Sequence, residues 1–335
     1  MAHVAAAITV HSLDQAHAAA AVAAERGADL VEYRVDTFTD DLPALTALVE
    51  QSALPCIVTC RPEWEGGEYE GEDDHRIAVF QHACAGTRRP AYIDVELIAY
   101  QRSDDFRAAI DALVDHPRQA TTADTGLILS SHDFEGRPRD LYQRVKSMAD
   151  APACRVIKVA WMARSLRDNV EAFELQASRT KPTIALCMGE YGLPSRVLAS
   201  KFGALLTFAT TGSEAGTAPG QPTITDLKNL YRWDAIRPTT RVFGVVGHPV
   251  GHSMSPAIHN AGFEATGFDG VYLPMPIAPS YEAFKATILT WLDHKPLHFR
   301  GASVTIPHKE NLLRFVAEQK GEVEPLAERI GAANT

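Results

Sequence analysis

The stretch Val156-Ile157-Lys158-Val159-Ala160-Trp161 is an apolar run that contains a single lysine. Its length and its β-branched residues predict a buried strand. A charged amine at such a place needs a reason, because burying an unpaired charge is costly. Two interpretations of Lys158 are open. It is a structural lysine that pairs with a carboxylate or extends to the strand end, or it is a nucleophile, since burial favours the neutral amine that attacks carbonyl carbon.

Seven further strand candidates accompany this run at regular intervals, with helical segments between them. The strands are expected at residues 4–10, 29–36, 56–61, 91–97, 126–133, 156–162, 182–189 and 204–210, and the helices at 12–26, 42–51, 73–86, 103–114, 138–149, 166–180 and 195–202. Eight such units in roughly 230 residues predict a (β/α)8 TIM barrel. The competing fold is a doubly wound open sheet, but its G-x-G-x-x-G turn occurs nowhere in the sequence.

The composition excludes several classes of protein. The chain has 335 residues, 46% of them hydrophobic and 22% charged, which is typical of a globular protein long enough for two domains. A net charge of −10, with no basic run longer than Arg88-Arg89, argues against nucleic acid and anionic membranes as partners. Five cysteines without CxxC spacing indicate a reducing compartment and no structural zinc. No signal peptide or long apolar segment is evident, so we expect a cytoplasmic protein.

Charged side chains gather where the expected barrel strands end, which is where barrel enzymes carry their catalytic residues. On the second strand, Glu32, Arg34 and Asp36 share one face, the inner one if the apolar residues between them pack outward. Further polar residues at the ends of strands three to five are Arg61, Glu65, Asp94, Glu96, Ser131, His132 and Asp133. Any one of these could be part of a structural salt bridge. Together with Lys158, they predict a catalytic site at one barrel mouth.

Lys158 and His132 together indicate imine chemistry. A neutral lysine condenses with a ketone, the protonated imine makes the adjacent C–H acidic, and a positioned histidine removes that proton. This is elimination or aldol chemistry that needs no metal, and the sequence contains no HExxH or CxxC motif, so we expect no metal ligands. The planar fork of an arginine matches a carboxylate. We therefore expect a small, hydroxylated and anionic substrate.

The motifs around these residues resemble those of type I 3-dehydroquinate dehydratase, in the same order across residues 1–236. They are Glu32-Tyr-Arg34-Val-Asp36, the run from Thr59 to Gly67, Ser131-His132-Asp133-Phe134, Lys158, Met188-Gly189-Glu190, Ser195-Arg196 and Ala218-Pro219-Gly220-Gln221. The resemblance implies a lyase of the shikimate pathway that needs no cofactor and dehydrates 3-dehydroquinate to 3-dehydroshikimate. It also makes a homodimer possible.

The same resemblance implies roles for individual residues. Lys158 would form the Schiff base, His132 would be the general acid/base, and Arg196 would bind the substrate carboxylate. The residues that would contact hydroxyls or order the site are Glu32, Arg34, Arg61, Thr217 and Gln221. At the position of Thr217 the family usually has serine.

The character of the chain changes near Tyr231. Residues 232–240 are expected to form a linker, and residues 241–335 a second, small α/β unit with strands at 241–247, 270–277 and 302–306. One helix is expected over 280–292. Another is expected to begin with Ser255 as N-cap and Pro256 in the first helical position, a pattern that could also be only a capping turn.

Three motifs of this second unit resemble the substrate-binding domain of shikimate dehydrogenase. They are Gly251-His252-Ser253-Met254-Ser255-Pro256, the run from Val304 to Glu310, and the run from Ile330 to Thr335. The resemblance implies that Ser253 and Ser255 hold the shikimate carboxylate and that Lys309 is catalytic. Thr305 and Asn334 would bind ring hydroxyls of shikimate or 3-dehydroshikimate.

Complete members of that family carry a further Rossmann domain for NADP, and the chain ends before it. Hydride transfer needs a bound nicotinamide, so we expect no dehydrogenase activity from this chain alone. Three interpretations remain open: an active dehydratase with an appended partial domain, a bifunctional enzyme whose other half is elsewhere, and a non-catalytic shikimate-binding module. The intact set of Lys158, His132 and Arg196 favours the first. A class I aldolase would also use a strand lysine, but the Ser131-His132-Asp133-Phe134 motif favours dehydration.

Overall fold

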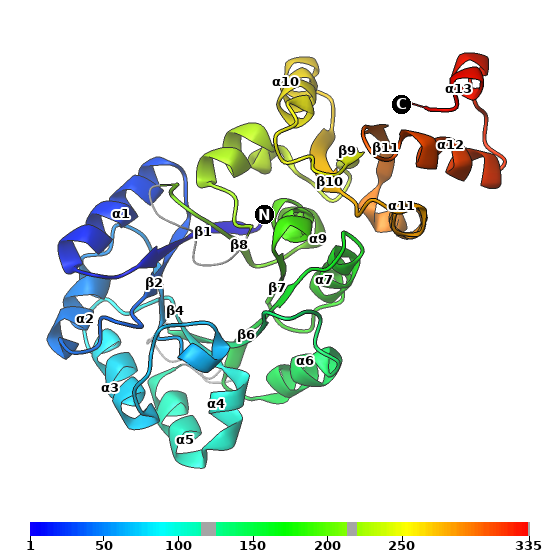
Figure 1. Ribbon diagram of the computed structural model, residues 1–335. Helices are drawn as coiled ribbons and strands as arrows, with labels where there is room; N and C mark the ends of the chain where they lie inside the picture. Colours follow the sequence, from blue (N-terminus) through cyan, green and yellow to red (C-terminus); the bar gives the residue numbers. More distant parts are fainter. Residues whose placement is uncertain (115–124, 213–219, 334–335) are drawn as a thin grey trace.

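The computed structural model describes residues 1–114, 125–212 and 220–333, which form an eight-stranded barrel and a smaller α/β unit (Figure 1). The barrel strands are β1 (His3–Thr9), β2 (Leu30–Arg34), β3 (Cys56–Thr59), β4 (Tyr92–Glu96), β5 (Gly126–Asp133), β6 (Cys154–Met162), β7 (Thr183–Met188) and β8 (Leu206–Ala209). All eight predicted strands are therefore confirmed.

The strands pair in parallel in the order β7-β6-β5-β4-β3-β2-β1-β8. The two ends of this sheet meet where the Leu205 amide donates a 3.0 Å hydrogen bond to the Thr183 carbonyl. The sheet is thus a nearly closed barrel, and the open-sheet alternative is wrong.

Helices surround the barrel and connect its strands (Figure 1). They are α1 (Leu13–Glu25), α2 (Leu42–Glu50), α3 (Asp73–Ala83), α4 (Leu97–Arg102), α5 (Asp104–Leu113), α6 (Leu141–Asp150), α7 (Asp168–Ala177), α8 (Leu193–Val197) and α9 (Ala199–Phe202). The sequence missed α4, which starts at the residue directly after β4 and has no capping side chain to announce it. The single helix expected over 195–202 is instead the pair α8 and α9, which meet at Leu198.

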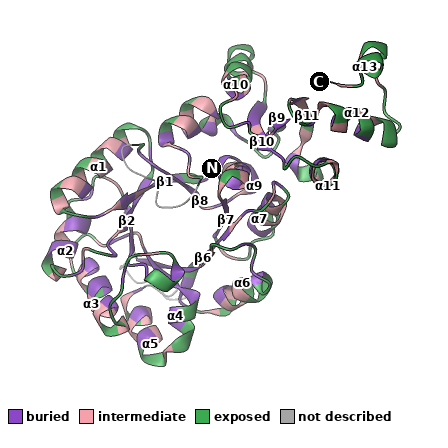
Figure 2. Ribbon diagram, in the orientation of Figure 1, coloured by how far each residue is buried: buried purple, intermediate pink, exposed green. Residues whose placement is uncertain are grey.

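Alternation along the strands separates two apolar layers. On β2, Val31 and Tyr33 point outward into the large core between strands and helices, as does Val35 just after the strand. A smaller cluster fills the barrel interior and includes Leu30, Ile57, Ile128 and Ile184. Figure 2 shows the buried strands inside a ring of helices whose outer faces are exposed. The charged residues Glu32 and Arg34 consequently belong to the inner face of β2, as predicted.

The second unit is a three-stranded parallel sheet in the order β10-β9-β11. Its elements are β9 (Arg241–Gly247), α10 (Ser255–Thr266), β10 (Gly270–Pro276), α11 (Tyr281–Asp293), β11 (Phe299–Val304), α12 (Lys309–Glu318) and α13 (Pro325–Ile330). The prediction that Ser255 is the N-cap of its helix is wrong by one residue. Met254 holds the cap position, and Ser255 is already helical while its amide donates to Ser253 Oγ at 3.2 Å.

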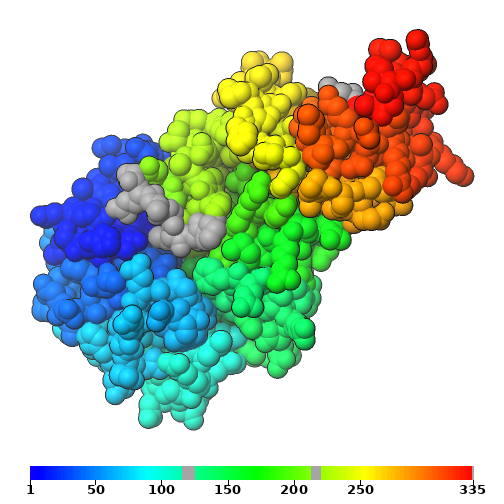
Figure 3. All heavy atoms as spheres, viewed as in Figure 1, coloured from blue at the N-terminus to red at the C-terminus, as the bar shows by residue number. Residues whose placement is uncertain are grey.

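The second unit packs against α7 and α9 of the barrel, and Figure 3 shows the two in continuous contact. The buried Lys201 amine of α9 donates to the carbonyls of Pro238 and Thr240 and lies 3.0 Å from His298 Nδ1. Trp291 of α11 donates through Nε1 to the Leu166 carbonyl at 3.3 Å. The residues described include no helix long and apolar enough to cross a membrane.

The contact at Lys201 predicts a stability effect. Lys201→Met keeps the apolar stem but removes the donor to the buried Thr240 carbonyl and to the partly buried Pro238 carbonyl, so the free energy of unfolding should fall by about 1–3 kcal/mol. Chemical denaturation measures this, with Lys295→Met, an exposed lysine on the second unit, as the control. Equal stability of Lys201→Met and wild type would show that the contact contributes nothing.

Candidate active site

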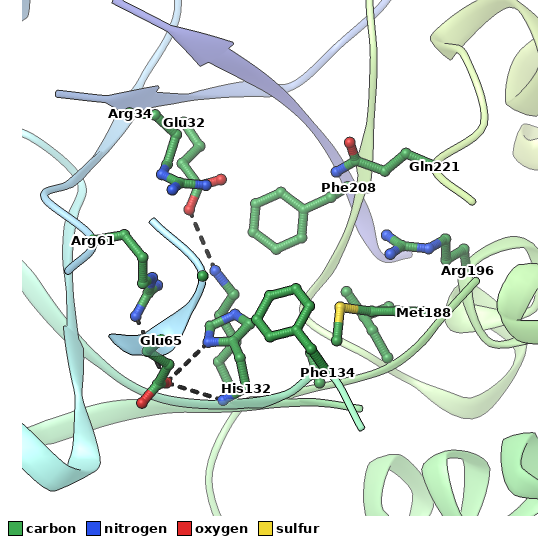
Figure 4. Close-up of a pocket in the computed structure, with 14 residues that line it drawn as sticks. Glu32, Arg34, Arg61, Glu65, His132, Phe134, Met188, Arg196, Phe208 and Gln221 are labelled. Atoms are coloured by element: carbon green, nitrogen blue, oxygen red, sulfur yellow. Dashed lines mark hydrogen bonds and ion pairs between the residues drawn. The ribbon is translucent and has the colours of Figure 1, made fainter. Parts of the chain in front are cut away.

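A cavity opens at the carboxyl ends of the barrel strands. Figure 4 shows its lining, which consists of Glu32, Arg34, Arg61, Glu65, Gly66, His132, Phe134, Lys158, Ala160, Leu186, Met188, Arg196, Phe208 and Gln221. The structure thus brings together seven of the eight barrel residues to which the family resemblance gave a role. The eighth, Thr217, lies outside the described residues.

Lys158 projects from β6 and is almost fully buried. Its Nζ lies 2.7 Å from Asp94 Oδ2 and 3.3 Å from Glu32 Oε1, and 4.4 Å from the centre of the Phe208 ring. The structure therefore contains the carboxylate pairing that a structural lysine would have. It also places the amine on the cavity wall beside His132, where a substrate carbonyl has access to it.

Arg61 is held in place by a set of buried acceptors. Its guanidinium donates to Asp94 Oδ1 and Glu96 Oε1, both at 2.7 Å, and to Ser130 Oγ at 2.8 Å. Although burial favours the neutral acid, Arg61 and Lys158 lower the pKa of Asp94. Asp94 thus links the lysine and the arginine as a shared counter-ion. Behind it, Arg76 of α3 neutralises Glu96 at 2.5 Å.

His132 is the last residue but one of β5 and forms a pair with Glu65. Both the backbone amide and Nδ1 of His132 lie within 3.0 Å of Glu65 Oε1. Burial lowers the pKa of His132, and the nearby charges of Arg61 and Lys158 lower it further, so the imidazole is neutral at pH 7. Burial raises the pKa of Glu65 to about 8 even though Arg61 opposes this. Because Glu65 occupies Nδ1, the Nε2 atom is the one left for a substrate.

Arg196 of α8 lies on the side of the cavity opposite to Arg61 and Glu65 (Figure 4). It is 2% exposed, and its Nε and Nη1 atoms have no hydrogen-bond partner among the described residues. Burial lowers its pKa to about 10, so it remains charged at neutral pH. A buried cation without a counter-ion is costly, and an anion from a ligand would remove that cost.

The remaining cavity residues differ in how they are held. Arg34 forms a forked pair with Asp36, through Nε at 3.2 Å and Nη2 at 2.5 Å. Phe134 lies against Gly66, whose positive φ of 78° and lack of a Cβ leave room for the ring. Gly66, Phe134, Met188 and Phe208 were not proposed as site residues from the sequence. The inward alternation of β7 and β8 is the signal that could have identified Met188 and Phe208.

The second unit gathers its singled-out residues at one edge of the sheet. Ser253 and Ser255 precede and begin α10, Thr305 follows β11, and Lys309 begins α12. Because β9 and β11 are adjacent and parallel, the segments after them lie at the same sheet edge. Asn334 lies outside the described residues. Within the described parts of the chain, no group of three or more His, Cys, Asp and Glu residues is placed to hold a metal ion.

Comparison with known proteins gives two family matches. Residues 4–238 match the model of type I 3-dehydroquinase, and residues 245–335 match the model of the shikimate dehydrogenase substrate binding domain. The chain is 38% identical to the chloroplastic bifunctional 3-dehydroquinate dehydratase/shikimate dehydrogenase of Arabidopsis thaliana, over 98% of this chain and 51% of that protein. It is 35% identical to a 3-dehydroquinate dehydratase of Desulfotalea psychrophila, over 61% of this chain and 87% of that protein.

Among solved structures, the dehydroquinate dehydratase and shikimate dehydrogenase of S. pombe AroM aligns with 98% of this chain and 61% of its own chain. The sequence identity is 26% and the TM-score 0.53. The chain spans about half the length of the bifunctional Arabidopsis relative.

The raised pKa of Glu65 predicts a pH-dependent stability. The unfolded carboxyl group loses its proton near pH 4.5 and the folded one near pH 8, so the folded state binds more protons between these values. Stability of the wild type should therefore decrease as the pH rises through this window. In Glu65→Gln this loss is absent, so the variant should gain about 1–2 kcal/mol relative to wild type between pH 6.5 and 8.

Denaturation at several pH values measures the difference. His132 is present in both proteins, so the titration of its unfolded imidazole contributes to both curves, and Glu63→Gln at an exposed position of the same turn is the control. A difference between Glu65→Gln and wild type that stays constant from pH 6.5 to 8 would contradict the prediction.

Proposed function

The chain belongs to the type I 3-dehydroquinase family, and on that premise we propose that its barrel, residues 1–236, is a 3-dehydroquinate dehydratase of the shikimate pathway. The reaction removes one water molecule from 3-dehydroquinate and yields 3-dehydroshikimate. The observation that carries the proposal is one cavity that combines the Lys158 amine, the neutral imidazole of His132 and the Arg196 guanidinium, whose Nε and Nη1 atoms have no hydrogen-bond partner in the described parts of the chain.

Substrate binding begins with an ion pair. The carboxylate of 3-dehydroquinate supplies the anion that Arg196 lacks, and the forked guanidinium suits it. This contact directs the ketone of the ring toward the opposite wall, where Lys158 lies. Glu32, Arg34 and Gln221 contact ring hydroxyls, and we assign Thr217 to the same role. Arg61 orders the site through its carboxylate partners.

Imine formation follows. The Lys158 nitrogen attacks the ketone carbon, and the carbonyl oxygen leaves as water once it has gained two protons. Asp94 and Glu32 lie 2.7 and 3.3 Å from Nζ, so they are placed to accept the proton that the ammonium form gives up. The resulting iminium carries a positive charge, which the two carboxylates and the face of Phe208 stabilise.

Elimination completes the reaction. His132 Nε2 removes a proton from the carbon next to the iminium, and the electron pair moves to the nitrogen to give an enamine. The electron pair on the nitrogen then moves back toward the ring, and the hydroxyl group on the following carbon leaves. His132 donates its proton to this hydroxyl group, so that water is released. Addition of water to the iminium frees the product and Lys158. The net change is the loss of one water, and His132 regains its neutral form.

For residues 241–335 we propose a substrate-binding unit of the shikimate dehydrogenase type. Ser253 and Ser255 are assigned to the shikimate carboxylate, Thr305 and Asn334 to ring hydroxyls, and Lys309 to catalysis in a complete enzyme. NADP would supply the hydride in such an enzyme. Among the described residues of this unit, β9 runs into Gly247-His248-Pro249 rather than into a glycine-rich phosphate turn, so the residues present do not fit NADP.

The state of the cysteines is informative about the cellular compartment. All five are free and buried, and burial raises the thiol pKa of Cys56 and Cys60 to about 12. Such thiols persist in a reducing environment, which supports a cytoplasmic location.

Borohydride trapping tests the dehydratase proposal. Incubation of the chain with 3-dehydroquinate and borohydride should leave a covalent adduct on Lys158, located by intact mass and peptide mapping. Lys158→Ala should form no adduct and lose on the order of 10⁴-fold or more in kcat, measured by the ultraviolet absorbance of the conjugated enone.

Lys181→Ala is the matched control, because Lys181 lies just before β7 at the opposite end of the barrel and its amine donates to the Ala151 carbonyl at 2.8 Å. It should keep both the adduct and the activity. Neither adduct nor enone from the wild-type chain would overturn the proposal and favour a non-catalytic binding module.

A further inference from the structure

Asn169 is a fully buried side chain near the start of α7 that lies outside the cavity lining but joins three segments around it. Its Nδ2 donates to the carbonyls of Leu166 at 2.9 Å and Tyr191 at 2.8 Å. Its Oδ1 accepts from the Ser195 amide at 2.9 Å. All hydrogen-bonding atoms of this amide are therefore used to connect the loop after β6, the loop after β7 and helix α8.

The bond to Ser195 acts as a helix cap supplied from another helix. The first amides of α8 have no partner within the helix, Pro194 has no N–H, and no side chain near the helix start caps it. The Ser195 amide, at the third position of α8, is satisfied by Asn169 instead. Such caps are worth about 0.5–2 kcal/mol in ordinary helices, and α8 has only five residues to stabilise itself.

Ser195 directly precedes Arg196, so what holds Ser195 determines where the guanidinium lies. Ser195 Oγ accepts from the Cys187 amide at 2.9 Å and donates to the Gly192 carbonyl at 2.8 Å, which attaches α8 to β7. Arg196 itself has no partner for Nε or Nη1 among the described residues, whereas Arg61 is held by two carboxylates. The position of Arg196 thus depends on the backbone of α8.

The second unit reaches the same group of hydrogen bonds. Trp291 of α11 is fully buried and donates through Nε1 to the Leu166 carbonyl, the one that also accepts from Asn169. The indole is fixed in turn by edge-on contact with Phe299, with ring centres 5.6 Å apart. One carbonyl oxygen therefore receives a donor from each unit.

We propose that Asn169 is a positioning residue that sets the place of the Arg196 guanidinium, and that Trp291 fixes the same carbonyl so that the second unit contributes to substrate binding in the barrel. This inference rests on the proposed function, in which Arg196 binds the substrate carboxylate. It assigns to Asn169 and Trp291 an effect on KM, since neither side chain reaches the reacting atoms.

Steady-state kinetics with 3-dehydroquinate provide the test. Asn169→Ala should raise KM by about tenfold, as expected for a lost buried cap, and change kcat by less than about twofold. Asn169→Asp keeps an acceptor for the Ser195 amide but has an oxygen in place of the donor to the Leu166 and Tyr191 carbonyls, so its KM should lie between those of wild type and Asn169→Ala. Trp291→Phe keeps the ring contacts and removes one long hydrogen bond, so we expect a KM increase of about twofold.

The control is Gln176→Ala on the same helix. Gln176 is equally buried and also bonds β7, through the Ala185 carbonyl at 2.6 Å, but it has no hydrogen bond to α8. This variant should lose stability and keep its KM. If Asn169→Ala and Gln176→Ala have the same KM as wild type, Asn169 has only a structural role and the inference is wrong.

A double-mutant cycle asks whether Asn169 acts through Arg196. In an Arg196→Met background the further change Asn169→Ala should leave KM unchanged, because the guanidinium to be positioned is gone. An additional tenfold increase in that background would overturn the inference. If Trp291→Phe has the same KM as wild type, the second unit does not contribute to substrate binding, and only the part of the inference that concerns Asn169 remains.

Binding measurements separate this inference from the proposed function. In Lys158→Ala, which cannot form the imine, titration calorimetry with 3-dehydroquinate should show that adding Asn169→Ala weakens binding about tenfold. A wild-type chain that binds without turnover would refute the dehydratase and leave the positioning role supported by this titration. A chain that does not bind 3-dehydroquinate at all would refute both.

Discussion

Charge pairing inside the barrel is the constraint on which the site depends. Lys158, Asp94, Arg61, Glu96 and Arg76 form an alternating chain of cations and anions, each almost fully buried and each within 2.7 Å of the next. Removing one member would leave its neighbours as unpaired charges in a medium that solvates them poorly, so the members position one another. Four elements, β3, β4, β6 and α3, supply these residues or lead directly into them. The closed barrel is what brings them to one place.

The two sides of the cavity are held in different ways, and the difference fits their chemistry. On the side of Arg61 and Glu65, every charged group has a partner within the protein, which suits residues that exchange protons without moving. On the side of Arg196, the Nε and Nη1 atoms of the guanidinium have no partner among the described residues, and the helix is held by Asn169 and Ser195. An arginine whose charge is already neutralised would gain little from a substrate carboxylate, whereas Arg196 would gain a counter-ion in the role proposed for it.

The two units share more than a covalent linker. Trp291 and Lys201 bond across the boundary, and the apolar core is continuous from the barrel helices into the second sheet. His294 adds ring contacts with Phe173 and Phe202. Because the Leu166 carbonyl takes part in both the boundary and the support of α8, the packing of the second unit and the binding side of the cavity are physically connected.

Much of this protein follows from the sequence by itself. The eight strands, most helices and the inward face of Glu32 and Arg34 are set by local periodicity, which depends only on near neighbours in the chain. Lys158 and His132 stand out because charged and titratable groups rarely occur in apolar strands. Only the tertiary structure decided that Asp94 is shared by Lys158 and Arg61, that two nitrogens of Arg196 have no partner within residues 1–114, 125–212 and 220–333, and that Asn169 caps α8. Ser195 and Asn169 are 26 residues apart, and Lys158 and Asp94 are 64 apart. Such pairings depend on how the barrel closes, and no local pattern encodes them.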